Sequence, residues 1–268
     1  MTMFWASPTT AIAERERFAV GTSGRSAMTI DPGYGRRRHR PTRAAARRRG
    51  HPLTPSGHPG RARMPVVTRA IRRLPNALGS EETGRVRGVL GRAFADDPVW
   101  TWLVRGRRSE ERAGAVLAHL VRSQVDRGGE LWAGADMEAV AAWVPPHTPP
   151  VREVDYLRQL PRVLVPLGVG GLRRLVPLAE TDRHHPKEPH WYLSVLGTDP
   201  AHQGCGFGGA LIEPFVERAD DAGVGCYLES SKESNVAFYR RFGFEVTDVL
   251  HIDRGRGPDL FLMWREPR

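Results

Sequence analysis

A glycine-rich turn, set between an apolar run and a helix-like segment, limits the fold of this chain more than any other feature of its sequence. Residues 203–208 read Gln-Gly-Cys-Gly-Phe-Gly; the apolar run 191–196 precedes them and the segment 210–223 follows. A strand, a tight turn and a helix in this order place several backbone N–H groups at a helix N-terminus. There the helix dipole favours an anion such as a pyrophosphate. Gly206 and Gly208 lack the Cβ that would keep a phosphate at a distance.

A second motif follows about thirty residues later. Residues 234–244 read Ser-Asn-Val-Ala-Phe-Tyr-Arg-Arg-Phe-Gly-Phe, a pattern that predicts a short helix ended by a glycine. Asn235 and Tyr239 lie four positions apart and therefore share one helix face. Phe238 and Phe242 share the neighbouring face, which is typical of residues that pack into a core.

Together the two motifs resemble the GNAT acyltransferase superfamily. The spacing Q-x-x-G-x-G is neither the Rossmann G-x-G-x-x-G nor a Walker loop, because no Gly-Lys-Ser/Thr follows it. In GNAT enzymes this turn holds the pyrophosphate of acetyl-CoA. The pattern N-x-x-x-F-Y-x-x-x-G-F places its Asn against the cofactor and its Tyr hydroxyl near the cofactor's sulfur. Cys205 departs from the family, which often has Lys or Arg there, so the loop loses a supplementary charge but keeps its backbone donors.

Further segments narrow the resemblance. Residues 93–98, 185–193, 199–204 and 228–231 are similar to the puromycin N-acetyltransferase branch of the superfamily. The resemblance also implies that the pantetheine amides of acetyl-CoA pair with the strand backbone like an added strand, near Leu196 and Thr198. The full set of cofactor-binding residues that it implies is Leu196, Gly197, Thr198, Gln203, Gly204, Cys205, Gly206, Phe207, Gly208, Gly209, Asn235, Phe238 and Tyr239.

Direct transfer to an amine, the usual route in the family, assigns roles to a few groups. A backbone N–H at a bulge near Leu196 or Gly197 would polarise the thioester carbonyl. Tyr239 is suited to protonate the departing thiolate. Glu229 ends the strand before the Tyr239 helix and is a candidate base or proton relay for the amine. Its alternatives are a capping role towards Ser231 or the following helix, and a chain of water molecules that carries the proton instead.

The order of apolar patterns suits an α/β GNAT fold, with a mixed central sheet splayed around acetyl-CoA and flanking helices. Helices are predicted from amphipathic periodicity and strands from short apolar runs bounded by turn residues. Helices are expected at 80–95, 109–127, 155–164, 171–178 and within 210–223, and strands at 66–72, 130–133, 138–144, 191–198, 225–229, 245–250 and 259–265.

The charge of the chain is concentrated at one end. The formal net charge is +10, and residues 1–63 alone hold thirteen Arg against three acidic residues. Residues 64–268 hold 27 basic and 27 acidic side chains, so the predicted catalytic domain is neutral. Residues 1–63 are rich in Arg, Pro and Gly and are predicted to be a disordered tail. We expect an inert tail or an extension upstream of a true start at Met64, with a nucleic-acid-binding arm as the alternative.

The remaining composition excludes several classes of site. No apolar stretch reaches eighteen residues and no secretory signal is visible, so neither a membrane span nor export is predicted. Cys205 and Cys226 form no C-x-x-C motif, and the histidines lack the spacing of metal ligands. The sequence therefore predicts a cytoplasmic monomer or homodimer that holds no metal, contacts no membrane and binds no specific nucleic acid.

Three functions fit these features. The first is acetyl-CoA-dependent N-acetylation of a primary amine on a small molecule, an aminonucleoside antibiotic being one candidate. The second is acetylation of a protein Lys or N-terminus, and the third is a non-catalytic GNAT-like regulator that binds acyl-CoA. Phe94, Trp100, Trp102 and Trp143 are expected to wall an apolar acceptor pocket.

Overall fold

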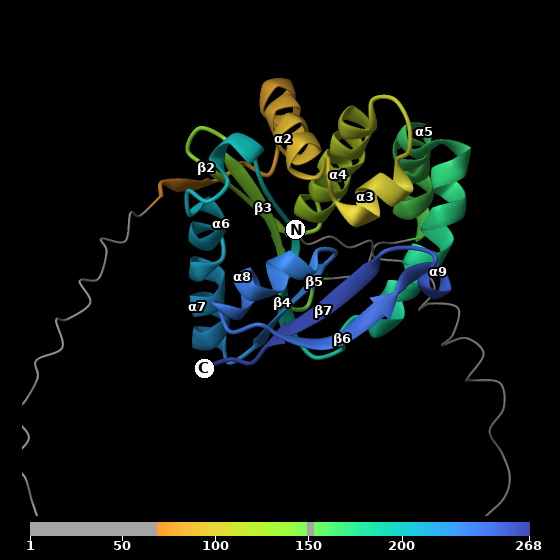
Figure 1. Ribbon diagram of the computed structural model, residues 1–268. Helices are drawn as coiled ribbons and strands as arrows, with labels where there is room; N and C mark the ends of the chain where they lie inside the picture. The colour runs from red at the N-terminus through yellow and green to blue at the C-terminus, as the bar shows by residue number, and fades with distance from the viewer. Residues whose placement is uncertain (1–68, 149–152) are drawn as a thin grey trace, which may run out of the picture. The chain divides into compact units, whose positions relative to one another are not determined.

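The computed structural model describes residues 69–148 and 153–268. The predicted tail and the start of the expected first strand lie outside the described residues. A seven-stranded sheet has the order β1-β2-β3-β4-β5-β7-β6 (Figure 1). Its strands are β1 Ile71–Arg73, β2 Glu130–Gly134, β3 Ala139–Val144, β4 His190–Thr198, β5 Gly225–Ser230, β6 Glu245–His251 and β7 Asp259–Arg265.

The sheet opens at its centre. All neighbouring strands are antiparallel except β4 and β5, which run parallel. The β4–β5 pairing ends at Leu193 and Leu228, although β4 continues to Thr198. Beyond that point β4 pairs only with β3, so its other edge faces a gap. This mixed sheet with a central splay confirms the α/β GNAT fold that the sequence predicts.

One face of the sheet is covered by α2 (Ser80–Ala93), α3 (Pro98–Leu103), α4 (Ser109–Val125) and α5 (Glu153–Leu178). The predicted amphipathic stripes of α2 and α4 form the core here. The two helices approach closely, since a Cβ on Gly114 would lie 2.4 Å from the carbonyl oxygen of Arg87.

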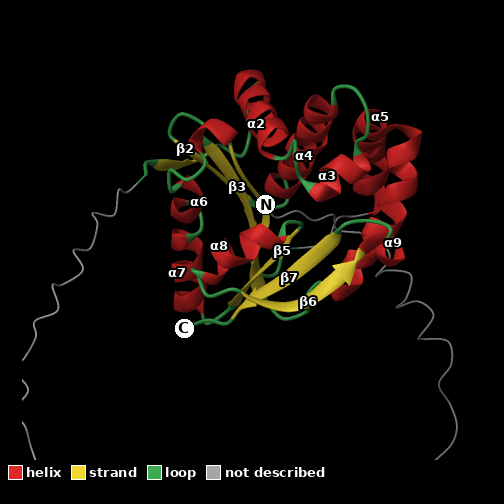
Figure 2. Cartoon of the chain, viewed as in Figure 1, coloured by secondary structure: helices red, strands yellow, loops and turns green. Residues whose placement is uncertain are grey.

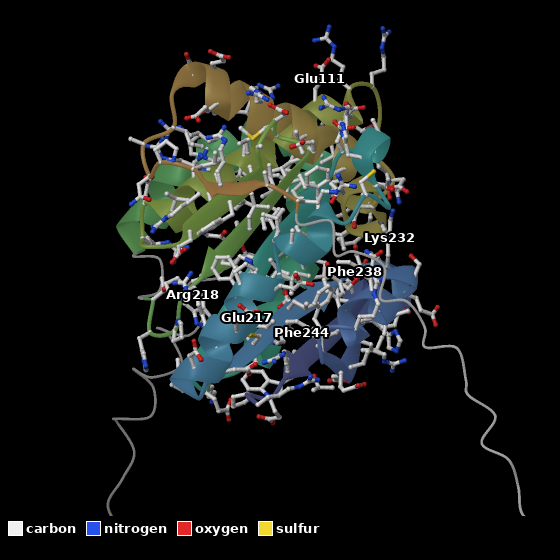
Figure 3. The ribbon with its side chains drawn as sticks, turned by 90° about the vertical axis from the view of Figure 1, so that its left-hand side faces the viewer. Glu111, Glu217, Arg218, Lys232, Phe238 and Phe244 are labelled. Carbon is white, nitrogen blue, oxygen red and sulfur yellow. The ribbon has the colours of Figure 1, made fainter. Side chains whose placement is uncertain are left out.

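The opposite face is covered by α6 (Phe207–Ala210), α7 (Glu213–Ala222) and α8 (Val236–Arg240), as Figure 2 shows. Phe215 of α7 stacks on Trp143, with ring centroids 4.6 Å apart. Arg218, labelled in Figure 3, lies 4.4 Å over the Trp191 ring and donates to both carboxylate oxygens of Glu130 at 2.8 and 3.0 Å. These contacts fix α7 against three different strands.

Prolines and glycines account for two differences from the expected helices. The segment 210–223 is not one helix, because α6 ends at Ala210 and Pro214 stands in the first turn of α7, where its missing N–H costs no bond. The two short helices expected near 155–178 are joined into α5, with a break at Gly168 (φ 66°). Short helical segments complete the described fold: η1 Ala179–His184, η2 Pro200–His202, η3 Glu233–Asn235 and α9 Ile252–Gly255. In the described part of the chain, no helix is long and apolar enough to cross a membrane.

Candidate active site

A cavity of about 480 Å³ lies beside the open half of β4, where the two sequence motifs meet. The loop after β4 and α6 supply one side of it, and η3 with α8 supplies the other. The residues that line it are Leu196, Thr198, His202, Gln203, Gly204, Gly206, Phe207, Gly208, Gly209, Lys232, Ser234, Asn235, Phe238, Tyr239 and Arg241. Most of the predicted cofactor-binding residues are thus brought around a single space.

The glycines of the loop have two different physical tasks. Gly204 (φ 75°) and Gly206 (φ 88°) adopt left-handed backbone conformations, and a Cβ on either would meet no atom within 4 Å. Gly208 and Gly209 are instead limited by space, because a Cβ there would lie 3.1 Å from Phe238 and 3.3 Å from Phe242. The first pair shapes the turn, and the second lets α6 pack directly on α8. Phe207, Gly208 and Gly209 begin α6, where backbone N–H groups have no partner within a helix, and all three residues line the cavity.

The end of η3 and the helix α8 that follows it present the predicted pair to the cavity. Asn235 and Tyr239 both line it, and the Tyr239 side chain is fully buried. Phe238, expected from periodicity to be core, also lines the cavity, with its ring 5.1 Å from Tyr239 in an edge-to-face arrangement. Arg241 lies 5.0 Å from the Phe238 ring centroid.

Two basic residues at this cavity were not predicted from the sequence. Lys232, labelled with Phe238 in Figure 3, donates to Asp96 at 2.6 Å, and Arg241 lies across the Phe238 ring. The residues that line the cavity include no Asp or Glu within the described ranges. The charged side chains that line the cavity are thus basic, with Lys232 paired to Asp96, and basic groups favour an anionic ligand. The only sequence signal was that both residues flank the Asn235–Tyr239 motif.

Three predicted site residues do not line this cavity. Gly197 faces α2, where a Cβ would lie 3.1 Å from Ala93 and Leu90. Cys205 is exposed, and its carbonyl accepts a hydrogen bond from Arg69 at 2.7 Å. Glu229 lies deeper, at the point where β4 and β5 separate.

The bulge expected near Leu196 or Gly197 is found earlier on β4. Consecutive β3 residues pair with Val195 and with Leu193, which leaves Ser194 as the extra residue. The Ser194 hydroxyl donates to Gln124 of α4 at 2.6 Å and also lies 3.1 Å from a β3 carbonyl. The expected position was wrong because β-register depends on the partner strand, which periodicity in one segment does not reveal.

Glu229 is a fully buried carboxyl that follows Leu228, the last residue of β5 to pair with β4. The hydroxyls of Tyr227 and Tyr192 donate to it at 2.9 and 3.2 Å. Burial raises the pKa of Glu229 to about 8, and the two hydroxyl donors only partly oppose that rise. The side chain contacts these tyrosines rather than Ser231, so the capping alternative is wrong. A carboxyl with such a pKa is suited to accept a proton near neutral pH.

Asp97 ties a helix on one face of the sheet to the end of β5. It caps α3 by accepting from Val99 and Trp100 backbone N–H groups at 2.9 and 3.1 Å. Its other oxygen accepts from the hydroxyl of Ser231. Burial raises the pKa of Asp97, against the effect of these donors. This contact and the neighbouring Lys232–Asp96 pair hold the turn between α2 and α3 beside the cavity.

The expected aromatic wall is not formed. Phe94, Trp100, Trp102 and Trp143 are buried in the core, and Trp143 lies on the α7 face, where its indole donates to the carbonyl of Leu211 at 3.1 Å. Sequence pattern alone does not separate a core aromatic from one that walls a pocket. Among the described residues, no cluster of three or more His, Cys, Asp or Glu has the arrangement of a metal site.

The fold is a mixed α/β sheet with a central splay, and a glycine-rich loop lies at the cavity beside that splay. Residues 164–244 match the family model of the acetyltransferase (GNAT) family. The chain is 29% identical over 188 residues to the uncharacterized N-acetyltransferase C550.08 of Schizosaccharomyces pombe, covering 65% of this chain and 76% of that protein. It is 39% identical over 71 residues to the mycothiol acetyltransferase of Mycolicibacterium vanbaalenii, covering 23% of this chain and 24% of that protein.

A solved structure agrees on the fold. This chain superposes on a crystal structure from Corynebacterium glutamicum that is described as histone acetyltransferase HPA2 and related acetyltransferase. The TM-score is 0.55 at 23% identity, over 75% of this chain and 97% of that one. The match over residues 164–244 and these similarities support an N-acetyltransferase of the GNAT type. The GNAT family implies acetyl-CoA as the co-substrate.

Proposed function

We propose that this enzyme transfers the acetyl group of acetyl-CoA directly to a primary amine of a small molecule. One observation carries the proposal: the glycine-lined cavity with its basic side chains and the buried carboxyl of Glu229 both lie at the place where β4 and β5 separate. Direct transfer needs the thioester and a proton acceptor for the amine near each other, and we assign both to the splay.

In this proposal the cavity binds the cofactor through three kinds of contact. The residue 203–209 loop holds the pyrophosphate with its backbone N–H groups, and Lys232 and Arg241 add positive charge. The free edge of β4 near Leu196 and Thr198 pairs with the pantetheine amides. Asn235 from η3 and Phe238 from α8 contact the pantetheine arm. The backbone of Gly197 and Cys205 remains part of the proposed binding surface, although their side-chain positions face elsewhere.

Two side chains handle the protons. Tyr239 protonates the CoA thiolate as it leaves, since a neutral phenol can donate to that group. Glu229 accepts the proton that the amine loses when its nitrogen bonds to the acetyl carbon. The raised pKa of Glu229, about 8, makes it basic enough for this task at the pH where free amine becomes available.

Charge supports a small-molecule acceptor over a protein. Residues 64–268 are balanced at 27 basic and 27 acidic side chains, which provides no net field to attract a strongly charged peptide. Aminonucleosides are the first class to test, because residues 185–193, 199–204 and 228–231 resemble that branch. Acetylation of a protein Lys or N-terminus is the alternative.

The acceptor test compares two substrate types on the full chain. The measurement is kcat/KM from CoA release, for a panel of aminonucleosides and aryl-amino-acid amines and for Lys-containing and free N-terminal peptides. Higher kcat/KM on at least one small amine supports the proposal. A kcat/KM for peptides that exceeds the value for small amines by more than about tenfold, a difference of about 1.4 kcal/mol, would overturn the small-molecule assignment. The assignment of acetyl-CoA chemistry would stand.

The same proposal includes the organisation of the chain. We propose that residues 64–268 form the catalytic domain and residues 1–63 a separate disordered basic tail without a specific nucleic-acid target. The enzyme is proposed to work in the cytoplasm as a monomer or homodimer, away from membranes and without a metal.

A further inference from the structure

A row of side chains leads from the buried carboxyl of Glu229 towards the surface, on a path that is separate from the cofactor cavity. The Nδ1 atom of His185 is buried and lies 4.0 Å from Oε1 of Glu229. The Nε2 atom of the same ring lies 3.2 Å from Nε2 of His190. The His185 side chain is 29% exposed, so a single ring spans from the interior to solvent.

Hydrogen bonding fixes the direction of the two neutral rings. His190 Nδ1 lies 2.6 Å from the carbonyl oxygen of Glu188, and because a carbonyl only accepts, this nitrogen carries the hydrogen. Neutral His190 therefore presents a lone pair at Nε2, and His185 must donate to it from its own Nε2. The Nδ1 of neutral His185 is then an acceptor, directed at the Glu229 carboxyl.

The surroundings keep this row in place and largely free of charge. The ring centroids of Tyr192 and Tyr227 each lie 4.9 Å from that of His185, and the Trp264 centroid lies 5.7 Å from that of His190, all in edge-to-face arrangements. Both tyrosine hydroxyls point to Glu229. Asp182 of η1 and Asp248 of β6 are the carboxylates that act on these tyrosines from other elements.

The outer end of the row opens onto a second cavity. This cavity has a volume of about 270 Å³ and is lined in part by His185, His190 and Tyr192, with Lys187 and Glu188 at its rim. It shares no lining residue with the cofactor cavity. Water in it can receive a proton that does not have to pass the bound cofactor.

We propose that His185 and His190 form the route by which the amine's proton leaves the active site, with His185 acting through Glu229 rather than on the substrate. This inference rests on the proposed role of Glu229. As the amine nitrogen bonds to the acetyl carbon, its N–H bond breaks and the proton joins Glu229. That proton then moves to Nδ1 of His185 while the Nε2 proton of His185 passes to His190 or to water in the outer cavity. The rings regain their starting tautomers by exchange with that water.

The electrostatics agree with a relay rather than a storage site. Burial lowers the pKa of both His185 and His190 to about 4, whereas the pKa of Glu229 is about 8. The proton is therefore bound mainly to Glu229 and occupies the histidines only transiently. The gap of about four pKa units makes the imidazolium about 10,000-fold less populated, which turnover of about 1 to 1,000 per second tolerates.

The decisive variants are His185→Gln and His185→Ala. We expect His185→Gln to lower kcat by about ten- to hundredfold, at the low end for a proton-transfer group, with the KM for acetyl-CoA unchanged. In His185→Ala, added imidazole should enter the outer cavity and restore kcat in proportion to its free-base concentration. A residue that only supports the fold gives no such pH-dependent rescue.

Two controls separate the possible failures. His184→Gln changes the neighbouring, exposed histidine, which meets Asp248 at 3.9 Å, and should keep wild-type kcat. Thermal melting and acetyl-CoA binding show whether each variant is folded, and His190→Gln gives a second test with the same expected loss. Wild-type kcat in both His185→Gln and His190→Gln, or rescue that is absent in folded His185→Ala, overturns the relay. If the wild-type enzyme transfers acetyl groups but Glu229→Gln has no effect, the proposed base fails instead.

Discussion

Replacing Glu229 with Gln should stabilise the protein and inactivate it at the same time. The carboxyl is fully buried, and its neighbours are two tyrosine hydroxyls and His185. Its pKa of about 8 in the folded protein lies above the ordinary value of 4.5. Between these two values the folded chain holds a proton that the unfolded chain releases. The free energy of unfolding therefore falls as pH rises through this window.

The size of the effect follows from the shift. Each pH unit in the window lowers the free energy of unfolding by about 1.4 kcal/mol. Between pH 4.5 and pH 7, ionisation of Glu229 in the unfolded chain therefore lowers the stability of the wild type by about 3 kcal/mol. Gln cannot ionise, yet its amide oxygen still accepts from Tyr192 or Tyr227. The stability advantage of Glu229→Gln over wild type should grow by about that amount across the window. The lowered pKa values of His185 and His190 affect both proteins and cancel in the difference.

Urea unfolding at pH 5, 6, 7 and 8 measures the stability difference, and initial rates over the same range measure activity. Wild-type kcat/KM should rise about tenfold between pH 7 and pH 9, because only about a tenth of Glu229 is ionised at pH 7. Glu229→Gln should lose this rise and most of its turnover. A stability difference that stays constant with pH would refute the buried-carboxyl reasoning, and wild-type turnover in the variant would refute the base.

Three further predictions concern other parts of the chain. Tyr239→Phe should lower kcat by about ten- to ten-thousandfold with acetyl-CoA affinity little altered, and wild-type rates over pH 6 to 9 would show that the hydroxyl is not needed. Asp97→Ala removes the cap of α3 and the partner of Ser231, so urea unfolding should show a loss of about 1 to 2 kcal/mol; an unchanged midpoint would mean that the cap contributes nothing. Deleting residues 1–63 should leave the melting temperature and kcat unchanged while removing any salt-sensitive binding to DNA, whereas a melting temperature lower by several degrees would show that the tail packs on the domain.

The sequence carried enough information for the fold and for the position of the cavity that we propose for the cofactor. Local signals sufficed because the residue 203–209 turn and the Asn235–Tyr239 helix each have a pattern of their own, and the sheet brings both to one gap. Pro214 was also a readable signal, although the break before α7 was not predicted from it.

Long-range packing explains what the sequence did not reveal. The bulge at Ser194 depends on the register with β3, and the contact between His185 and Glu229 joins segments 44 residues apart. Trp100 and Trp143 look alike in sequence whether they fill a core or wall a pocket; here both are core. Lys and Arg are common at protein surfaces, so Lys232 and Arg241 carry no signal of a site in the sequence. Their position at the cavity depends on the folded chain.

The central claim is that the glycine-rich loop binds acetyl-CoA. Isothermal titration calorimetry of acetyl-CoA with the wild-type protein and with Gly206→Val tests it most directly. Gly206 has φ 88°, which Val adopts only with strain, and its Cβ would point into open space at the cavity. Gly223→Val is the matched control, because Gly223 (φ 63°) is equally open but ends α7 and does not line the cavity. The account predicts one site in wild type and in Gly223→Val, and binding at least about 100-fold weaker, or about 2.7 kcal/mol, in folded Gly206→Val. Equal affinity in all three proteins would contradict the assignment of this loop to the cofactor.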